Sequence, residues 1–170
     1  MELKPIERLM LINQYKILEA LSKEDADFYS NCREVLEEGY ELHYQDLFET
    51  ISDVVIKEEE CKEVLDILDM FRAITFSYRK LEDKQGLTEY MIKFDGFDSN
   101  DKDEYKRYAY TKYFILKLDR YKELQYNGKD TDYNSHAPKL PKYRRMLDQW
   151  KKATNKDELT KEEIFHMIDA

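Results

Sequence analysis

Tyrosine and basic side chains alternate between residues 102 and 122 in a pattern that could bind nucleic acid. The tyrosines of this segment are Tyr105, Tyr108, Tyr110, Tyr113 and Tyr121. Seven lysines and arginines against three acids give it a local charge of +4. Aromatic rings stack on bases and cations neutralise phosphates, so Tyr105, Tyr108 and Lys112 are candidates for such contacts. The favoured alternative is that tyrosines at helical spacing pack in a core or a subunit interface.

A second basic segment covers residues 139–152 and has six bases against a single acid, Asp148. Its candidate contact residues are Lys139, Lys142, Arg144 and Arg145. Phosphates or an acidic protein surface could dock there. However, segment 57–70 holds six acids and two bases, which makes it an available partner in the same chain or in a neighbouring subunit. Charge pairing between the two segments is therefore the favoured interpretation.

The residues that usually carry catalysis or bind metals show no recognisable spacing. His43, His136 and His166 are far apart and form no HxxxH pair, and Cys32 and Cys61 form no CxxC pair. The chain also has no glycine-rich phosphate loop and no nucleophile elbow. We therefore assign no catalytic residue, cofactor or metal, and disfavour an enzyme.

The loop 95–101 is rich in oxygen ligands and invites comparison with a calcium-binding EF-hand. Counted from Asp98, the position that requires glycine is Asp103, and the position that requires a bidentate glutamate is Ala109. The match fails. We expect Asp98 to cap a turn or the following helix, and Phe97 to fill the core.

The elements that position these side chains are predicted to be helices. Only four glycines and three prolines interrupt 170 residues, and 42% of the residues are hydrophobic. These features predict an all-α, single compact domain over residues 1–170, with about six to eight helices. The strongest helical pattern covers 57–81, where acids open the segment and bases close it, as the helix dipole favours. We expect this helix to be central.

Capping residues and apolar periodicity place the remaining helices. Ser22 and Asp25 form a variant capping box before a helix whose inner face would include Phe28, and Thr160 and Glu163 form another box near the end of the chain. The expected segments are 5–21, 22–39, a short helix within 40–56, 101–124, 141–152 and the residues after 160.

Composition also restricts the setting of the protein. A net charge of −9 argues against indiscriminate binding to nucleic acid or to anionic membranes. No stretch approaches the roughly 18 apolar residues of a membrane span, and the first residues lack the apolar core of a signal peptide. We expect a cytoplasmic protein with two reduced cysteines and no membrane partner.

Several blocks, in this order along nearly the whole chain, resemble the YfbU family. The blocks are Glu7-Arg8-Leu9, Asn13-Gln14-Tyr15-Lys16, Leu36-Glu37-Glu38-Gly39-Tyr40, Gly96-Phe97-Asp98, Lys142-Tyr143, Arg145-Met146-Leu147, Trp150, Leu159-Thr160, Glu163-Ile164 and Ile168. The resemblance implies an all-helical bacterial cytosolic protein. It brings no established activity, so no catalytic residues are carried over from it.

The expected role is a homo-oligomeric interaction or regulatory protein. Tyrosines have apolar rings and polar tips that suit interfaces, and complementary acidic and basic segments can set the register between subunits. The alternative is a nucleic-acid-binding regulator that uses segment 102–122 or segment 139–152. The sequence assigns no small-molecule ligand.

Overall fold

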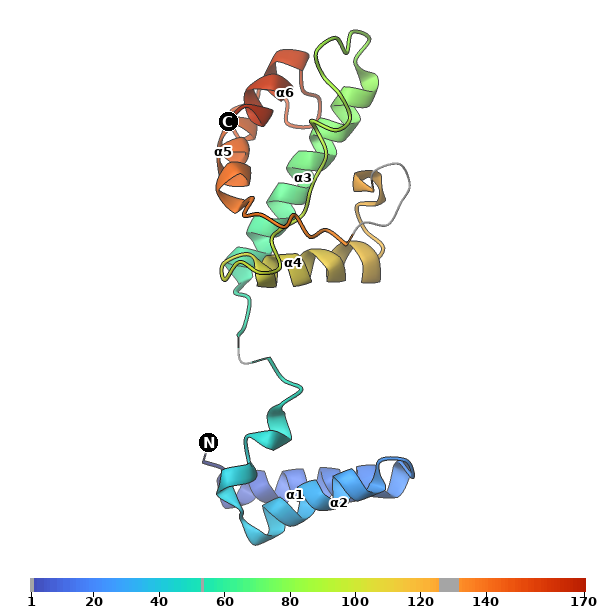
Figure 1. Cartoon of the computed structure of the whole chain (residues 1–170), viewed down its shortest axis with the longest axis vertical. Helices are drawn as coiled ribbons and strands as arrows, with labels where there is room; N and C mark the ends of the chain where they lie inside the picture. Colours follow the sequence, from blue (N-terminus) through green and yellow to red (C-terminus); the bar gives the residue numbers. More distant parts are fainter. Residues whose placement is uncertain (1, 53, 126–131) are drawn as a thin grey trace. The chain divides into compact units, whose positions relative to one another are not determined.

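The computed structural model describes residues 2–52, 54–125 and 132–170. Over these residues the chain is all-helical, with six α-helices, one π-helical turn and no β-strand. This confirms the predicted all-α class. The chain divides into two compact units, Met1–Val55 and Ile56–Ala170 (Figure 1). None of the helices described is both long and apolar enough to cross a lipid bilayer.

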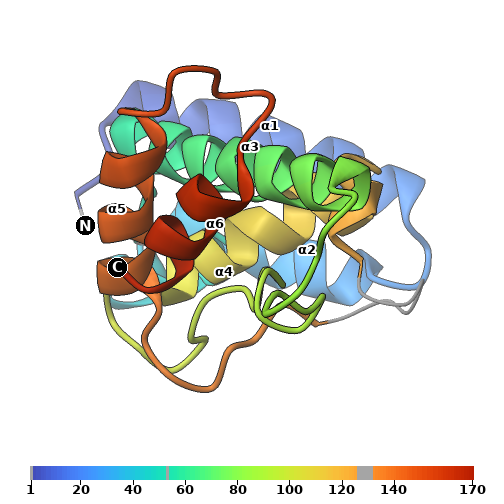
Figure 2. The ribbon, with the colours of Figure 1, turned by 90° about the horizontal axis from the view of Figure 1, so that it is seen from above.

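Unit 1 is built on a helical hairpin. Helices α1 (Pro5–Leu21) and α2 (Ala26–Glu38) pack side by side (Figures 1 and 2). Helix α2 ends at Gly39, whose left-handed φ of 77° is the common helix stop. The Arg8 guanidinium of α1 donates to the carbonyls of Leu36 and Glu37, the latter at 3.0 Å. Since the last carbonyls of a helix lack partners within it, Arg8 both caps α2 and clamps the hairpin.

The hairpin has a thin core. The buried hydrophobic residues described in unit 1 are Cys32, Leu36 and Tyr44, and α1 contributes none. The prediction that Phe28 belongs to the inner face of the second helix is wrong, since this side chain is 59% exposed. Two 3₁₀ turns, Glu41–His43 and Asp46–Phe48, follow α2.

Unit 2 is organised around helix α3 (Glu58–Lys80), which confirms the predicted central helix. Its side chains include nine buried residues, more than any other described helix contains. Helix α4 (Tyr105–Lys112) crosses α3 near its beginning, and α5 (Leu140–Trp150) packs against α3 and α6 (Lys161–Ile168) (Figure 1).

The predicted capping box at the start of α6 is present. The Thr160 hydroxyl accepts from the Glu163 N–H at 3.2 Å, and the Glu163 carboxylate accepts from the Thr160 N–H at 2.8 Å. This box fixes where the last helix begins.

The core of unit 2 contains an aromatic cluster centred on Tyr143 of α5. Its ring centroid lies 5.1 Å from that of Phe71, 5.7 Å from Phe94 and 5.6 Å from Phe97. Phe94 and Phe97 come from the irregular stretch that follows α3, and Phe97 is fully buried, as predicted. The irregular segment is therefore part of the core.

The predicted helix over 101–124, with its basic tyrosine-rich part at 102–122, is too long. Helix α4 covers Tyr105–Lys112, a π-helical turn covers Tyr113–Lys117, and Tyr121 has a left-handed φ of 52°. The Tyr121 hydroxyl donates to Asp69 of α3 at 2.6 Å, and the Arg72 guanidinium lies 3.9 Å from the ring centroid. The contacts with α3 accompany a change of backbone direction that a continuous helix would not allow, so Tyr121 lies outside α4.

Replacing Gly96 with alanine should destabilise unit 2. Gly96 has a φ of 89°, and a Cβ atom there would lie 1.8 Å from the Tyr133 carbonyl oxygen. Because a backbone atom blocks the space, we expect Gly96→Ala to lower the free energy of unfolding by more than about 2 kcal/mol. Urea unfolding followed by tyrosine fluorescence measures the loss.

Gly86→Ala is the matched control for this substitution. Gly86 has a similar φ of 85°, but the added Cβ would meet the Phe165 ring at 3.1 Å, and a side chain can shift. The control should lose only the conformational cost, about 1–2 kcal/mol. Equal losses in the two variants would contradict the role of the Tyr133 carbonyl.

Candidate partner surface

A buried carboxylate positions the two basic segments. Glu104, the residue before α4, is 1% exposed. Its oxygens accept from the backbone N–H groups of Asp98 at 2.8 Å, Lys139 at 2.7 Å and Leu140 at 2.6 Å. The N–H groups at the start of a helix lack internal partners and favour an anion. Glu104 therefore caps α5 and places its basic residues beside the start of α4.

Glu63 of α3 pairs with an arginine from each basic segment. The Arg107 guanidinium lies 2.9 Å from its carboxylate, and Arg144 Nε lies 2.6 Å from it. Arg107 is buried and also contacts Glu60 at 3.1 Å. Burial opposes ionisation of Glu63, but the hydrogen bonds from Arg144 and Arg107 prevail and hold its pKa below the usual value. Pairing between segment 139–152 and the acidic segment thus occurs within the chain at Arg144.

The candidate residues of α4 are engaged with one another and with the core. Lys112 Nζ donates to the Tyr108 hydroxyl at 3.1 Å, and the ring of Tyr108 packs against the core of unit 2. Tyr105 is half-buried, with Lys106 Nζ 5.4 Å from its ring centroid. These rings are only partly available for stacking on a base.

The candidate residues of α5 differ in how far they are engaged. Lys139 Nζ donates to Asp95 at 3.1 Å, and Arg145 donates to the Ala170 carbonyl at 3.1 Å. Lys142 is exposed and has no ion pair among the residues described. Lys142 and Arg145 are therefore the members that an external partner could reach with the least disturbance.

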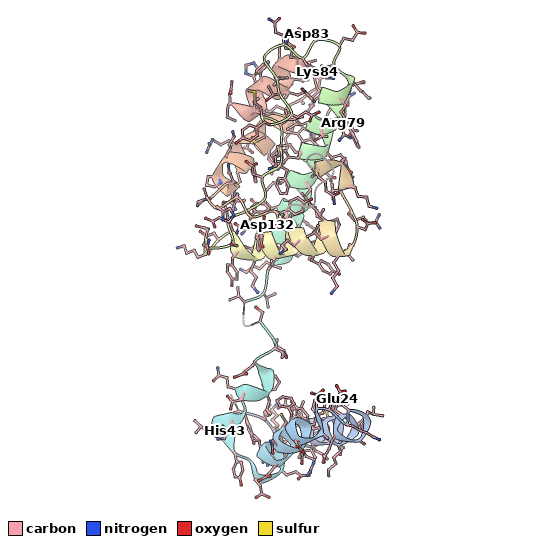
Figure 3. All side chains as sticks on the ribbon, turned by 45° about the vertical axis from the view of Figure 1, so that its right-hand side comes forward. Glu24, His43, Arg79, Asp83, Lys84 and Asp132 are labelled. Atoms are coloured by element: carbon pink, nitrogen blue, oxygen red, sulfur yellow. The ribbon has the colours of Figure 1, made fainter. Side chains whose placement is uncertain are left out.

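The three histidines are divided between the two structural units. His43 belongs to unit 1 (Figure 3) and lies 3.1 Å from Asp46, whereas His136 and His166 belong to unit 2. In the part of the chain that is described, no three His, Cys, Asp or Glu side chains are placed to hold a metal. Burial raises the pKa of the Cys32 and Cys61 thiols, which disfavours the reactive thiolate.

Helix α1 carries an exposed apolar surface that was not predicted as a site. We define the outer stripe as the seven residues that recur on one side of this helix. They are Ile6, Leu9, Met10, Asn13, Ile17, Ala20 and Leu21, and all are exposed. The opposite face of α1 is half-buried against α2. Its residues are Arg8, Leu11, Ile12, Tyr15 and Glu19. The sequence signal was the width of the apolar pattern, which exceeds what one packing face requires.

Comparison with models of known protein families identifies the family of this chain. The model of the YfbU domain matches residues 1–170, which is the whole chain. The chain belongs to the YfbU family. The match spans both structural units, so the exposed hairpin is as much a part of the YfbU domain as unit 2 is. In this YfbU chain the Gly96-Phe97-Asp98 block brings the core residue Phe97 next to the Tyr133 backbone, where Phe97 N donates to the Tyr133 carbonyl at 3.0 Å.

Replacing Glu104 with glutamine should destabilise unit 2 without changing its shape. A neutral amide has one acceptor oxygen, so at least one buried N–H group would face an amide nitrogen instead of an oxygen. We expect Glu104→Gln to lower the free energy of unfolding by about 3 kcal/mol, because lost bonds to a charge and unsatisfied donors both cost energy. Urea denaturation followed by circular dichroism measures this loss.

Glu162→Gln in the first turn of α6 is the control, because Glu162 is exposed. Its effect should stay within about 0.5 kcal/mol, as for most surface substitutions. If both variants unfolded at the same urea concentration, Glu104 would not have the capping role that we assign to it.

Proposed function

We propose that this YfbU-family protein is a homo-oligomeric interaction or regulatory protein of the bacterial cytoplasm. The main support for this proposal is that unit 1 exposes far more large apolar side chains than it buries. Twelve large apolar side chains between Ile6 and Val55 are exposed, against the three buried ones described there. Extensive apolar exposure of this kind marks surfaces that bind another protein. A helical hairpin with so thin a core gains stability when a partner covers it.

The state of the basic residues also favours a protein partner over nucleic acid. Arg107 and Arg144 are paired with Glu63, and Lys139 is paired with Asp95. A cation that is already paired must give up its carboxylate before it can neutralise a phosphate. The basic segments therefore offer less free charge to nucleic acid than their composition indicates.

Oligomerisation is tested by the mass of the full chain in solution. The single chain has a mass of 20.7 kDa. We expect size-exclusion chromatography with light scattering to give an integral multiple of this mass, with dissociation only on strong dilution. A mass of one chain at every concentration would contradict the proposed function.

The nucleic-acid alternative is tested by fluorescence anisotropy with labelled DNA and RNA at low and moderate salt. We expect no salt-dependent binding, because the chain has a net charge of −9 and Arg107, Arg144 and Lys139 are already paired with carboxylates. The informative variant is Lys142→Glu with Arg145→Glu, which leaves the pair between Arg144 and Glu63 intact. Binding that weakens with salt, and weakens further in this variant, would support the alternative instead.

A further inference from the structure

We propose that the outer stripe of α1 is the self-association surface, and that the same stripe of a second copy covers it. This inference rests on the proposed function and assigns its contact residues. The five large apolar residues of the stripe are 52–77% exposed. They are Ile6, Leu9, Met10, Ile17 and Leu21. An apolar face of this length in water favours association.

The spacing of the stripe fits another helix. Along its centre, Ile6, Met10, Asn13, Ile17 and Ala20 follow one another at intervals of four, three, four and three residues. This is the interval pattern of helices that pack along each other with interlocking side chains. The opposite face of α1 already packs in the hairpin. Two such hairpins would therefore form a four-helix arrangement with a shared core.

The chemistry of the stripe fits a copy of itself. In a two-fold interface the same patch is present on both sides, so a charge in the patch can meet its own kind. The stripe contains no charged residue, although 38% of the chain is charged. Its one polar residue is Asn13, near the middle. A single asparagine in an apolar seam can pair with its counterpart and fix the register.

The five large apolar residues of the stripe supply most, but not all, of the area of a standard dimer contact. Covering five large apolar side chains removes on the order of 100 Å² each, or roughly 500 Å² per copy. A standard interface buries about 800 Å² per partner. The exposed side chains at the two edges of the stripe, Gln14 and Lys16, extend the contact towards that value.

The first test is the double substitution Met10→Glu with Ile17→Glu in the full chain. These side chains are 62% and 53% exposed, so the change spares the packing within the hairpin. It should raise the dissociation constant of the oligomer at least about a hundredfold. Light scattering measures this change, and circular dichroism checks that helicity is kept.

Leu42→Glu is the matched control, because Leu42 is 85% exposed in the same unit but lies outside α1. It should leave the oligomer unchanged. If the wild type is oligomeric and the double variant dissociates no more than this control, the stripe proposal is wrong while the proposed function stands. A monomeric wild type instead defeats the proposed function itself.

Chemical cross-linking tests the identity of the occupant and does not depend on how the double variant folds. With Cys61 changed to serine, Asn13→Cys should react with a short bis-maleimide to give dimers joined through the two introduced thiols. Glu34→Cys, at an exposed position of α2, should give far fewer. Mass spectrometry of the cross-linked peptides identifies the bond. If the protein is an oligomer but the Asn13→Cys variant gives no cross-link between copies, the proposal is wrong.

Discussion

The buried carboxylate of Glu104 is the contact on which the arrangement of unit 2 depends. Glu104 immediately precedes α4. Its carboxylate accepts hydrogen bonds from the backbone N–H groups of Asp98 in the loop and of Lys139 and Leu140 at the beginning of α5. These donors would otherwise be buried without partners, which costs more than the bonds add. With α5 held in this way, Tyr143 reaches the aromatic cluster and Arg144 reaches Glu63.

The two units differ in how far they bury their apolar residues. Unit 2 covers α3 with helices and with an irregular segment that contributes Phe94 and Phe97. Unit 1 clamps its helices with polar contacts, such as Arg8 at the end of α2 and Arg33 between Glu19 and Glu37. Such contacts fix geometry but bury little apolar surface. Exposed apolar side chains are therefore concentrated in unit 1, whereas most of the basic residues lie in unit 2.

Basic composition overstates the free charge of the two basic segments for a physical reason. A count of charges registers Arg107 and Arg144 as available, although both are bound to Glu63. Pairing depends on which helices cross, and the acid lies 44 residues from Arg107 along the chain. Lys142 has the same formal charge but no ion pair among the residues described. The paths of α4 and α5 past Glu63 distinguish these residues.

Local interactions are what the sequence by itself determined. The extent of α3 and the capping box at Thr160 follow from periodicity and from residues a few positions apart, so they could be predicted. The burial of Phe97 could be predicted because it is the one large apolar side chain in the polar loop 95–101. The left-handed turn at Tyr121, the capping of α5 by Glu104 and the need for glycine at position 96 depend on distant partners. Similarly, α1 has apolar residues on two faces, and only the packing of α2 decided which face remains exposed, because helical spacing alone treats the two faces alike.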